Sequence, residues 1–140
     1  MRKIAIVYWS GTGNTLAMAQ AVAAGAQEAG AEVSLISAGQ FGADLVSQYD
    51  AIAFGCPAMG GEVLEESEFE PMFSSCESLL KGKPIALFGS YGWGDGEWMR
   101  TWEDTCRADG AQLEHPSVIC QESPDAEAIT QCRALGAALA

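Results

Sequence analysis

The fold of this chain is decided by ten residues, Val7-Tyr8-Trp9-Ser10-Gly11-Thr12-Gly13-Asn14-Thr15-Leu16. They read as the end of an apolar strand, a loop dense in glycine and hydroxyl groups, and the start of an alanine-rich helix. The backbone N–H groups of such a loop and the positive end of the helix dipole form a site for an anion. The loop contains no lysine or arginine, so we expect neutral donors to hold that anion, with side chains from Ser10, Thr12, Asn14 and Thr15.

Two well-known phosphate-binding patterns do not match this loop. A nucleotide-hydrolysing P-loop needs the lysine of G-x-x-x-x-G-K-[S/T], and no lysine is present. The dinucleotide pattern G-x-G-x-x-G is matched by Gly11 and Gly13, but Leu16 stands at the third glycine position. Several donor side chains in so short a loop favour a terminal phosphate monoester, which has three free oxygens. A turn whose hydroxyl groups merely cap the helix remains the simpler alternative.

Composition limits the class of protein. The chain has 140 residues, of which 49% are hydrophobic, enough for one domain over residues 1–140 with a substantial core. No run reaches the roughly 18 apolar residues of a membrane span, and we expect no signal peptide at the N-terminus. The five cysteines include no C-x-x-C pair, which favours reduced thiols and a cytoplasmic location. A single histidine gives no basis for a metal site.

The net charge of −12 limits the partners. Nucleic acid and anionic membranes repel such a protein, so we expect neither as a partner. Protein partners with basic docking faces are attracted and steered. The acidic residues crowd two segments, residues 62–70 and 95–104, although a merely solubilising surface is the alternative interpretation.

Strand and helix signals alternate along the whole chain. Strands are expected at residues 4–8, 33–36, 51–55, 85–89 and 113–120, and helices at 14–29, 42–46, 65–80, 97–108 and 125–139. Gly30 and Gly110 stand where helices should end, and Ser123-Pro124 is expected to open the last helix. Near-continuous apolar strands separated by helices predict an α/β fold, with a parallel sheet covered on both faces.

Two further loops follow the third and fourth expected strands, at residues 55–62 and 89–98. In an open parallel sheet, ligands bind beyond the carboxyl ends of the strands, so these loops should meet the hydroxyl-rich loop. The second loop carries Tyr91, Trp93 and Trp98 among four glycines. Large aromatic side chains on flexible backbone indicate a flat ligand, which the glycines allow the backbone to approach. Together the three loops predict one flat, phosphorylated molecule.

These motifs resemble those of the flavodoxins, specifically the short-chain type, over essentially the full chain. The matching segments are Ser10-Gly11-Thr12-Gly13-Asn14-Thr15, Pro57-Ala58-Met59-Gly60 and Gly89-Ser90-Tyr91-Gly92-Trp93-Gly94. The resemblance implies a three-layer flavodoxin-like fold, with a five-stranded parallel sheet of order 2-1-3-4-5 and helices on both faces. It also implies bound FMN and one-electron transfer at low potential.

Site residues follow from the same resemblance. The phosphate loop corresponds to residues 10–15, the aromatic flavin partner to Trp93, the second flavin-covering residue to Met59, and the flavin-edge carboxylate to Glu62. For Trp9 and Trp98, contact with the ligand and ordinary packing both stay open. The expected FMN-binding residues are Trp9, Ser10, Gly11, Thr12, Gly13, Asn14, Thr15, Pro57, Ala58, Met59, Gly60, Gly61, Glu62, Ser90, Tyr91, Gly92, Trp93, Gly94 and Trp98.

The segment Met59-Gly60-Gly61-Glu62 predicts a turn that can change its backbone conformation. We hypothesise that the Gly60 carbonyl rotates toward the hydrogen that flavin N5 gains on reduction. The rotated turn is of type II, which needs a positive φ at its third residue, and Gly61 adopts this without strain.

The expected function is that of a low-potential one-electron carrier. Its FMN is bound non-covalently and shuttles between semiquinone and hydroquinone to pass electrons between redox enzymes, so it is an electron-transfer protein rather than an enzyme. Nearby carboxylates disfavour the anionic hydroquinone.

The alternative is an FMN-dependent quinone-type reductase, which needs a substrate pocket over the flavin. A thiol enzyme built on Cys56 lacks the arginine of C-x5-R, because Glu62 stands in its place. A carrier must dock and leave, so we expect a monomer.

Overall fold

A parallel β-sheet forms the centre of the structure, a computed structural model that describes residues 1–140. Its strands are β1 (Lys3–Tyr8), β2 (Glu32–Ser37), β3 (Ala51–Gly55), β4 (Pro84–Tyr91), β5 (Gln112–Leu113) and β6 (Val118–Gln121). They run in the order β2-β1-β3-β4-β5, and β6 also pairs with β4. All pairings are parallel, so the expected order 2-1-3-4-5 is confirmed.

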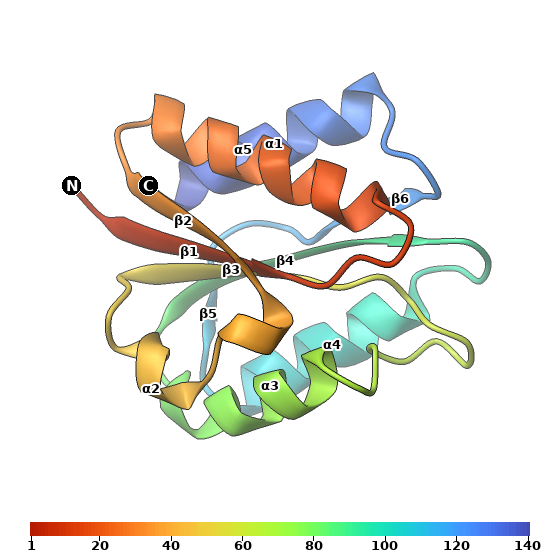
Figure 1. The fold of residues 1–140 in the computed structure, drawn as a ribbon, viewed down its shortest axis with the longest axis horizontal. Helices are drawn as coiled ribbons and strands as arrows, with labels where there is room; N and C mark the ends of the chain where they lie inside the picture. The colour runs from red at the N-terminus through yellow and green to blue at the C-terminus, as the bar shows by residue number, and fades with distance from the viewer.

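Helices cover both faces of this sheet, which confirms the three-layer arrangement (Figure 1). They are α1 (Asn14–Glu28), α2 (Ala43–Val46), α3 (Phe69–Cys76), α4 (Glu97–Ala108) and α5 (Ala126–Leu139), with short 3₁₀ turns at Ala38–Gln40 and Glu77–Leu79. α1 and α5 lie on one face, and α2, α3 and α4 on the other. None of the helices combines the length and the apolar character that a membrane crossing needs.

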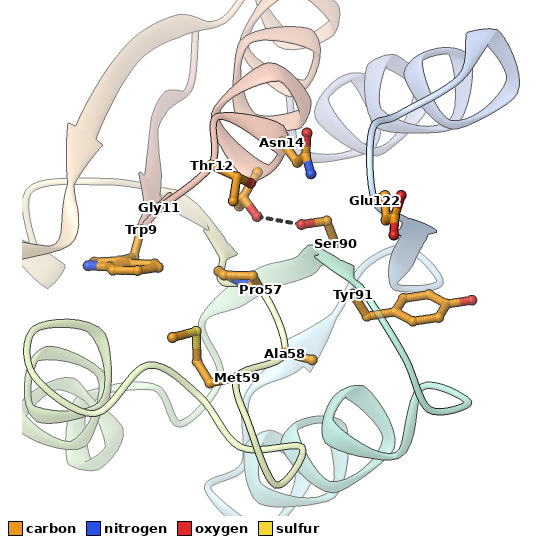
Figure 2. A pocket seen from close by; sticks show the side chains of 12 residues that line it. Trp9, Gly11, Thr12, Asn14, Pro57, Ala58, Met59, Ser90, Tyr91 and Glu122 are labelled. Carbon is orange, nitrogen blue, oxygen red and sulfur yellow. Dashed lines mark hydrogen bonds between the residues drawn. The ribbon is translucent and has the colours of Figure 1, made fainter.

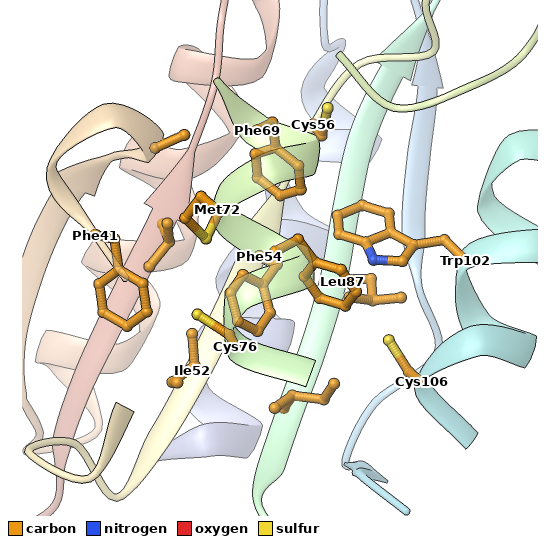
Figure 3. Packing of buried hydrophobic residues seen from close by; sticks show 14 of the residues in the cluster. Phe41, Ile52, Phe54, Cys56, Phe69, Met72, Cys76, Leu87, Trp102 and Cys106 are labelled. Carbon is orange, nitrogen blue, oxygen red and sulfur yellow. The ribbon is translucent and has the colours of Figure 1, made fainter. Parts of the chain in front are cut away.

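Two apolar cores fill the spaces between these layers. On the α3 and α4 side the core is rich in aromatic rings (Figure 3). Phe73 meets Phe54 edge to face with ring centroids 5.1 Å apart, and Trp102 meets Phe69 in the same way at 5.4 Å. Such pairs contribute roughly 0.5–1.5 kcal/mol beyond the burial of their area. The core therefore fixes α3 and α4 against the sheet whose carboxyl ends carry the site.

The core on the opposite face depends on close contact between α1 and α5. A Cβ atom on Gly25 would collide with the backbone of Arg133, and one on Gly136 would collide with the carbonyl of Val22. The two helices therefore touch through backbone, with a glycine from each at the crossing.

The fifth strand differs from the single strand expected over residues 113–120. It is divided into β5 and β6, and residues 114–117 between them leave the sheet. Ile85 pairs with Leu113 and Phe88 with Val118. An advance of three residues along β4 therefore corresponds to an advance of five residues from β5 to β6. Pro116 has no N–H to donate to a ladder, which favours an interruption at this point.

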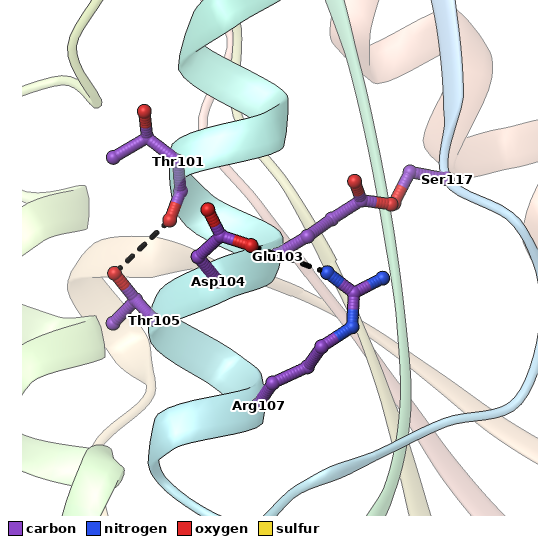
Figure 4. A network of polar contacts seen from close by, with 6 residues as sticks. All are labelled: Thr101, Glu103, Asp104, Thr105, Arg107 and Ser117. Atoms are coloured by element: carbon purple, nitrogen blue, oxygen red, sulfur yellow. Dashed lines mark hydrogen bonds and ion pairs between the residues drawn. The ribbon is translucent and has the colours of Figure 1, made fainter.

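The segment between β5 and β6 is attached instead to α4. The Ser117 hydroxyl donates to Glu103 Oε2 at 2.6 Å, on the same helix as the Arg107–Asp104 ion pair (Figure 4). Thr105 Oγ1 also donates to the carbonyl of Thr101 on this helix. The Ser117–Glu103 hydrogen bond therefore ties the segment between β5 and β6 to α4 where the ladder is broken.

Two helix starts lie later than expected. α5 begins after Asp125, whose Oδ1 accepts the Ala128 N–H at 2.8 Å, so Ser123-Pro124 precedes the cap and does not form it. α3 begins at Phe69 and not at residue 65, because the Glu65 carboxylate accepts the N–H groups of Glu68 and Phe69 at 2.7 and 2.9 Å. The side chain of Glu65 thus caps the first N–H groups of α3, and residues 65–68 do not form a helical turn.

Two helix ends match the expectation. Gly30 and Gly110 adopt φ values of +98° and +81°, and the residues that follow them donate back to Ala26 and Cys106. This six-to-one hydrogen bond is the mark of a Schellman motif, in which glycine avoids a Cβ clash.

Candidate cofactor site

A cavity of about 420 Å³ opens at the carboxyl ends of the strands (Figure 2). This volume lies in the range of small-molecule sites. Four segments surround it: the loop after β1, the loop after β3, the end of β4 and the residues after β6. The lining residues are Trp9, Gly11, Thr12, Asn14, Thr15, Pro57, Ala58, Met59, Ser90, Tyr91, Gly92 and Glu122. No lysine or arginine is among them, so any anion here is met by neutral donors.

The loop after β1 presents these donors. Ser10 Oγ accepts the N–H groups of Gly13 and Leu16 at 3.1 and 3.2 Å, which fixes the loop around the start of α1. The hydroxyl proton of Ser10 therefore remains free to be donated to an anion. Asn14 and Thr15 are the first residues of α1, where backbone N–H groups have no acceptor within the helix. Capping and anion binding are thus combined in one loop.

A pair of hydroxyl groups joins this loop to β4. Thr15 Oγ1 lies 3.2 Å from Ser90 Oγ, and the two residues are only 1% and 4% exposed. Further backbone bonds tie the segments together: the N–H of Ala58 donates to Ser90 at 2.9 Å, and that of Glu122 donates to Tyr91 at 2.7 Å. The walls of the cavity are therefore connected independently of any ligand.

The segment Met59–Glu62 forms a tight turn beside the cavity. The N–H of Glu62 donates to the carbonyl of Met59 at 2.9 Å, and Gly61 has a φ of +81°. Gly60 has no positive φ, so these values define a type II turn. No atom lies within 4 Å of a Cβ placed on Gly60 or Gly61, so the Cβ positions of both glycines face open space. The turn has the conformation that the sequence analysis assigned to the rotated state.

Glu62 folds against the loop after β4. Its carboxylate occupies the space that a Cβ on Gly94 would need. Partial burial and the carboxylates of Glu97 and Asp95 raise the pKa of Glu62. Its Oε1 atom is buried and has no hydrogen-bond partner. An N–H donor that reached this edge, such as the imide of a flavin, would satisfy that oxygen. Glu62 itself does not line the cavity.

The remaining expected residues are spread around the cavity. Ser10 and Gly13 lie on the outer side of the phosphate loop, where a neighbouring hollow also includes Trp9. Trp93 is 61% exposed and does not line the cavity, although it follows Gly92, which does. Its ring is thus available at the surface beside the site.

Trp9 and Trp98 have different roles. Trp9 lines the cavity, and its Nε1 donates to Glu68 at 3.2 Å. Trp98 is 2% exposed, donates to the carbonyl of Cys56 at 3.4 Å and packs against Tyr91. Trp98 therefore packs in the core and does not line the cavity, which favours the packing interpretation. Trp98 is the second residue of α4, and its position on this helix directs the ring into the core.

One lining residue was missed by the sequence analysis. Glu122 follows β6, adopts a φ of +58° and lines the cavity. The expected last strand ended at residue 120, and the loop after it was not considered. The rule that ligands sit beyond strand ends applies to that strand as well, and it is the signal that indicates Glu122.

Cys56 does not have the environment of a reactive thiol. It is fully buried, its Sγ accepts the N–H of Glu65 at 3.4 Å, and burial raises the pKa of the thiol to about 12. The thiolate is the nucleophilic form, so a thiol-enzyme role is excluded.

Comparison with known proteins agrees with this geometry. Residues 6–136 match the family model described as flavodoxin. The chain is 46% identical to the flavodoxin of Clostridium beijerinckii, over 96% of this chain and 97% of that protein. It is 45% identical to the flavodoxin of Megasphaera elsdenii, over 98% of each. The solution structure of two-electron reduced Megasphaera elsdenii flavodoxin superposes with a TM-score of 0.90, covering 97% of each chain at 46% identity.

Proposed function

The chain belongs to the flavodoxin family, and from this premise we propose that it is a low-potential one-electron carrier whose FMN shuttles between semiquinone and hydroquinone. FMN is the cofactor of the family, and when bound it supplies the one-electron chemistry. Flavodoxins are electron-transfer proteins rather than enzymes, so no catalytic acid, base or nucleophile is required. The observation that carries the proposal is the cavity itself, with an uncharged anion cradle at one end and Met59 and Tyr91 near the other.

Each loop has a separate task in holding FMN. The N–H groups and hydroxyls of residues 10–15 take the phosphate, with Thr15 fixed by Ser90. Met59 covers one face of the ring with a soft, adaptable side chain, and Trp93 covers the other. The unpartnered Oε1 of Glu62 accepts the N–H of the ring edge.

The Met59–Glu62 turn responds to reduction. In its type II form the Gly60 carbonyl would be available to accept a hydrogen from a reduced flavin ring, and Gly61 allows this form without strain. A Cβ atom placed on Gly60 or Gly61 would meet open space, so no neighbouring side chain packs against the turn at these two positions. This supports a role in stabilising the one-electron reduced protein.

Carboxylates at the site disfavour a second negative charge. Glu122 lines the cavity, and Glu62 lies beside Glu97. Arg100, which follows Glu97 on α4, is paired with Asp95 at 3.0 Å. Since about 59 mV corresponds to 1.4 kcal/mol for one electron, a few screened carboxylates lower the second potential by an amount on the order of a hundred millivolts.

The charge of the whole chain supports partners with basic docking faces. With a net charge of −12, association with such partners is steered and slows as salt is added. We further propose that the carrier is monomeric and cytoplasmic, because it must dock and leave and because its five cysteines are free. No observation in the structure favours the quinone-type reductase.

A ligand titration tests the proposal. Apoprotein is titrated with FMN and with riboflavin, and quenching of flavin fluorescence reports binding. We expect FMN to bind at least about a hundredfold more tightly, because several charge-assisted hydrogen bonds of roughly 1.5–3 kcal/mol each hold the phosphate. Equal affinities for the two flavins, or uptake of neither, would contradict the proposal.

A further inference from the structure

Three sulfur-containing side chains from distant parts of the chain meet between α1, α5 and β6. Met18 lies on α1, Cys132 on α5 and Cys120 on β6. The Sγ atom of Cys120 lies 3.5 Å from the Sδ atom of Met18. Burial, and then the charge of the nearby Cys120 thiolate, raise the pKa of Cys132 to about 12, so the two cysteines are neighbours. No C-x-x-C pair indicates this cluster in the sequence, because only the fold brings its members together.

The inner side of the sulfur cluster is apolar. Met18 and Cys132 are fully buried and belong to the core that α1 and α5 share with the sheet. Cys120 is half-buried and packs against the same core. Apolar surroundings provide no oxygen ligands for hard metal ions such as magnesium or calcium. The cluster therefore offers sulfur as its donor atoms.

The outer side of the cluster opens to the surface through Cys120. This residue lines a hollow of about 340 Å³ together with Ser123, Asp125 and Glu127, and no lysine or arginine lines that hollow. Burial and then the Asp125 carboxylate raise the pKa of Cys120, so this carboxylate lies near the thiol. A hollow lined by one sign of charge concentrates ions of the opposite sign. A cation can thus approach Cys120 from solvent past two acidic side chains.

This set of donors fits a soft metal ion. Thiolate and thioether ligands together favour Cu(I), whereas a structural zinc site takes four tetrahedral ligands from cysteine, histidine and carboxylates. The cluster has three sulfur atoms, and one of them is the thioether of Met18. At a metal–sulfur distance of about 2.3 Å, three sulfur atoms around one ion lie roughly 4 Å apart. The contact of 3.5 Å between Cys120 and Met18 is already close to that separation.

We propose that Met18, Cys120 and Cys132 form a binding site for Cu(I). A thiol that coordinates a metal ion loses its proton, so the two cysteines release two protons to solvent as the ion enters. The copper stays in its Cu(I) state throughout, and no electron is transferred. Met18 supplies the third ligand as a neutral thioether.

The sulfur cluster lies behind the wall of the cofactor cavity. None of its three residues lines that cavity. Cys120 is paired with Ser90 between β6 and β4, and its Sγ atom lies 3.6 Å from the carbonyl oxygen of Glu122. Ser90 and Glu122 both line the cavity from the other side. The copper site is thus separate from the flavin site, and it adds to the proposed carrier function without depending on it.

A competition titration of the FMN-loaded protein tests the site. Cu(I) is added under argon in the presence of a coloured Cu(I) chelator, and we expect the protein to take one equivalent. Cys120→Ala/Cys132→Ala should weaken this binding at least about a hundredfold, because two of the three ligands are lost. Cys76→Ala/Cys106→Ala removes two buried thiols from the opposite core and should weaken it less than about threefold. Equal weakening in both variants, or no uptake by the wild-type protein, would overturn the proposal.

A third variant and a second metal test the chemistry of the ligands. Met18→Leu keeps the volume of the side chain and removes its sulfur, so the fold should persist while Cu(I) binds about tenfold more weakly. Zn(II) at the same concentration as Cu(I) should not displace it. An unchanged affinity in Met18→Leu, or displacement of Cu(I) by Zn(II), would contradict a site of two thiolates and a thioether.

X-ray absorption at the copper edge locates the ion without any substitution. We expect three sulfur neighbours at about 2.3 Å. Oxygen neighbours would place the ion among the carboxylates of the surface hollow and would overturn the proposal. The flavin absorption of the same samples separates the two proposals. Protein that takes up no FMN contradicts the carrier function alone, and FMN-loaded protein that binds no Cu(I) contradicts the copper site alone.

Discussion

Thr15 Oγ1 and Ser90 Oγ lie 3.2 Å apart in the buried wall between the first turn of α1 and the end of β4. The two residues come from parts of the chain 75 positions apart, and the contact joins the phosphate loop to the strand that leads into Tyr91 and Trp93. Both residues also line the cofactor cavity, so a bound ligand can complete the hydrogen bonds of this hydroxyl pair. The anion cradle and the aromatic loop are therefore held as one unit.

Thr15→Val should weaken FMN binding about tenfold, because one hydroxyl donor to the phosphate is lost and Ser90 is left unpaired. Riboflavin, which lacks the phosphate, should bind the variant nearly as well as it binds the wild-type protein. Fluorescence titration of both flavins measures the effect, with Thr130→Val on the exposed side of α5 as the control. An equal loss for both flavins would show that Thr15 acts only through the packing of the loop.

Gly136→Ala should lower the free energy of unfolding by about 2–3 kcal/mol, because its Cβ would meet the Val22 carbonyl across the α1–α5 crossing. Alanine also favours the helical conformation over glycine by about 1 kcal/mol. The sign of the measured change therefore shows whether the clash of the added Cβ or the helix propensity is the larger effect. Urea unfolding measures it. Gly92→Ala, with open space around its Cβ, is the control and should change stability by less than about 0.5 kcal/mol. A stabilised Gly136→Ala protein would mean that the helices are not in backbone contact.

Gly61→Ala should lower the potential of the first one-electron reduction by roughly 40–85 mV. The φ of +81° at Gly61 costs an alanine about 1–2 kcal/mol, and about 1.4 kcal/mol corresponds to 59 mV for one electron. Gly60→Ala is the matched control, since its φ is not positive and its Cβ meets nothing. If the two variants shift this potential equally, or neither shifts it, the type II turn does not stabilise the reduced protein.

Glu77 should make stability depend on pH near neutrality. Burial, followed by hydrogen bonding and charge repulsion from Asp109, raises the pKa of Glu77 to about 7. The folded protein holds this proton more tightly than the unfolded chain does. The stabilisation is therefore complete below the ordinary pKa of 4.5 and is lost as the pH rises through about 7.

Glu77→Gln removes this dependence, because the amide stays neutral and donates to Asp109. We expect the variant to be more stable than the wild-type protein by about 1 kcal/mol at pH 8, a value reduced by solvent screening, and nearly equal to it at pH 5. Urea unfolding at both pH values measures the difference. A difference that is the same at pH 5 and pH 8 would contradict the shared proton.

The layers of the fold could be predicted because local signals and tertiary structure agree. β1, β3 and β4 read as apolar runs because both faces of the central sheet are buried, and Gly30 and Gly110 end their helices as expected. Residues 114–117 could not be placed in the same way. Their departure from the sheet depends on Pro116 and on the contact of Ser117 with Glu103, which lies 14 residues away.

The start of α3 was missed for an electrostatic reason. Glu65 reads as a good helix former, yet its buried carboxylate accepts three backbone N–H groups and the Ser67 hydroxyl. Burial alone raises the pKa of this carboxyl, but these hydrogen bonds outweigh it and hold the pKa at about 2. Propensity scales do not include a charged cap of this kind.

Within the site, the residues that line the cavity were mostly predictable, because clusters of glycine and hydroxyl residues directly after parallel strands indicate a ligand-binding loop. Trp98 and Glu122 were not. The position of Trp98 on α4 directs its ring into the core. The position of Glu122 at the cavity depends on where β6 ends. Both depend on element boundaries, which are the least certain part of any reading of a sequence.

Stepwise anaerobic reduction of the FMN-loaded protein, followed by its visible spectrum and potential, tests the central claim most directly. The account predicts two separated one-electron steps: a long-wavelength blue intermediate appears first, and the flavin then bleaches at a lower potential. A single two-electron step with no radical would contradict the carrier and favour a reductase.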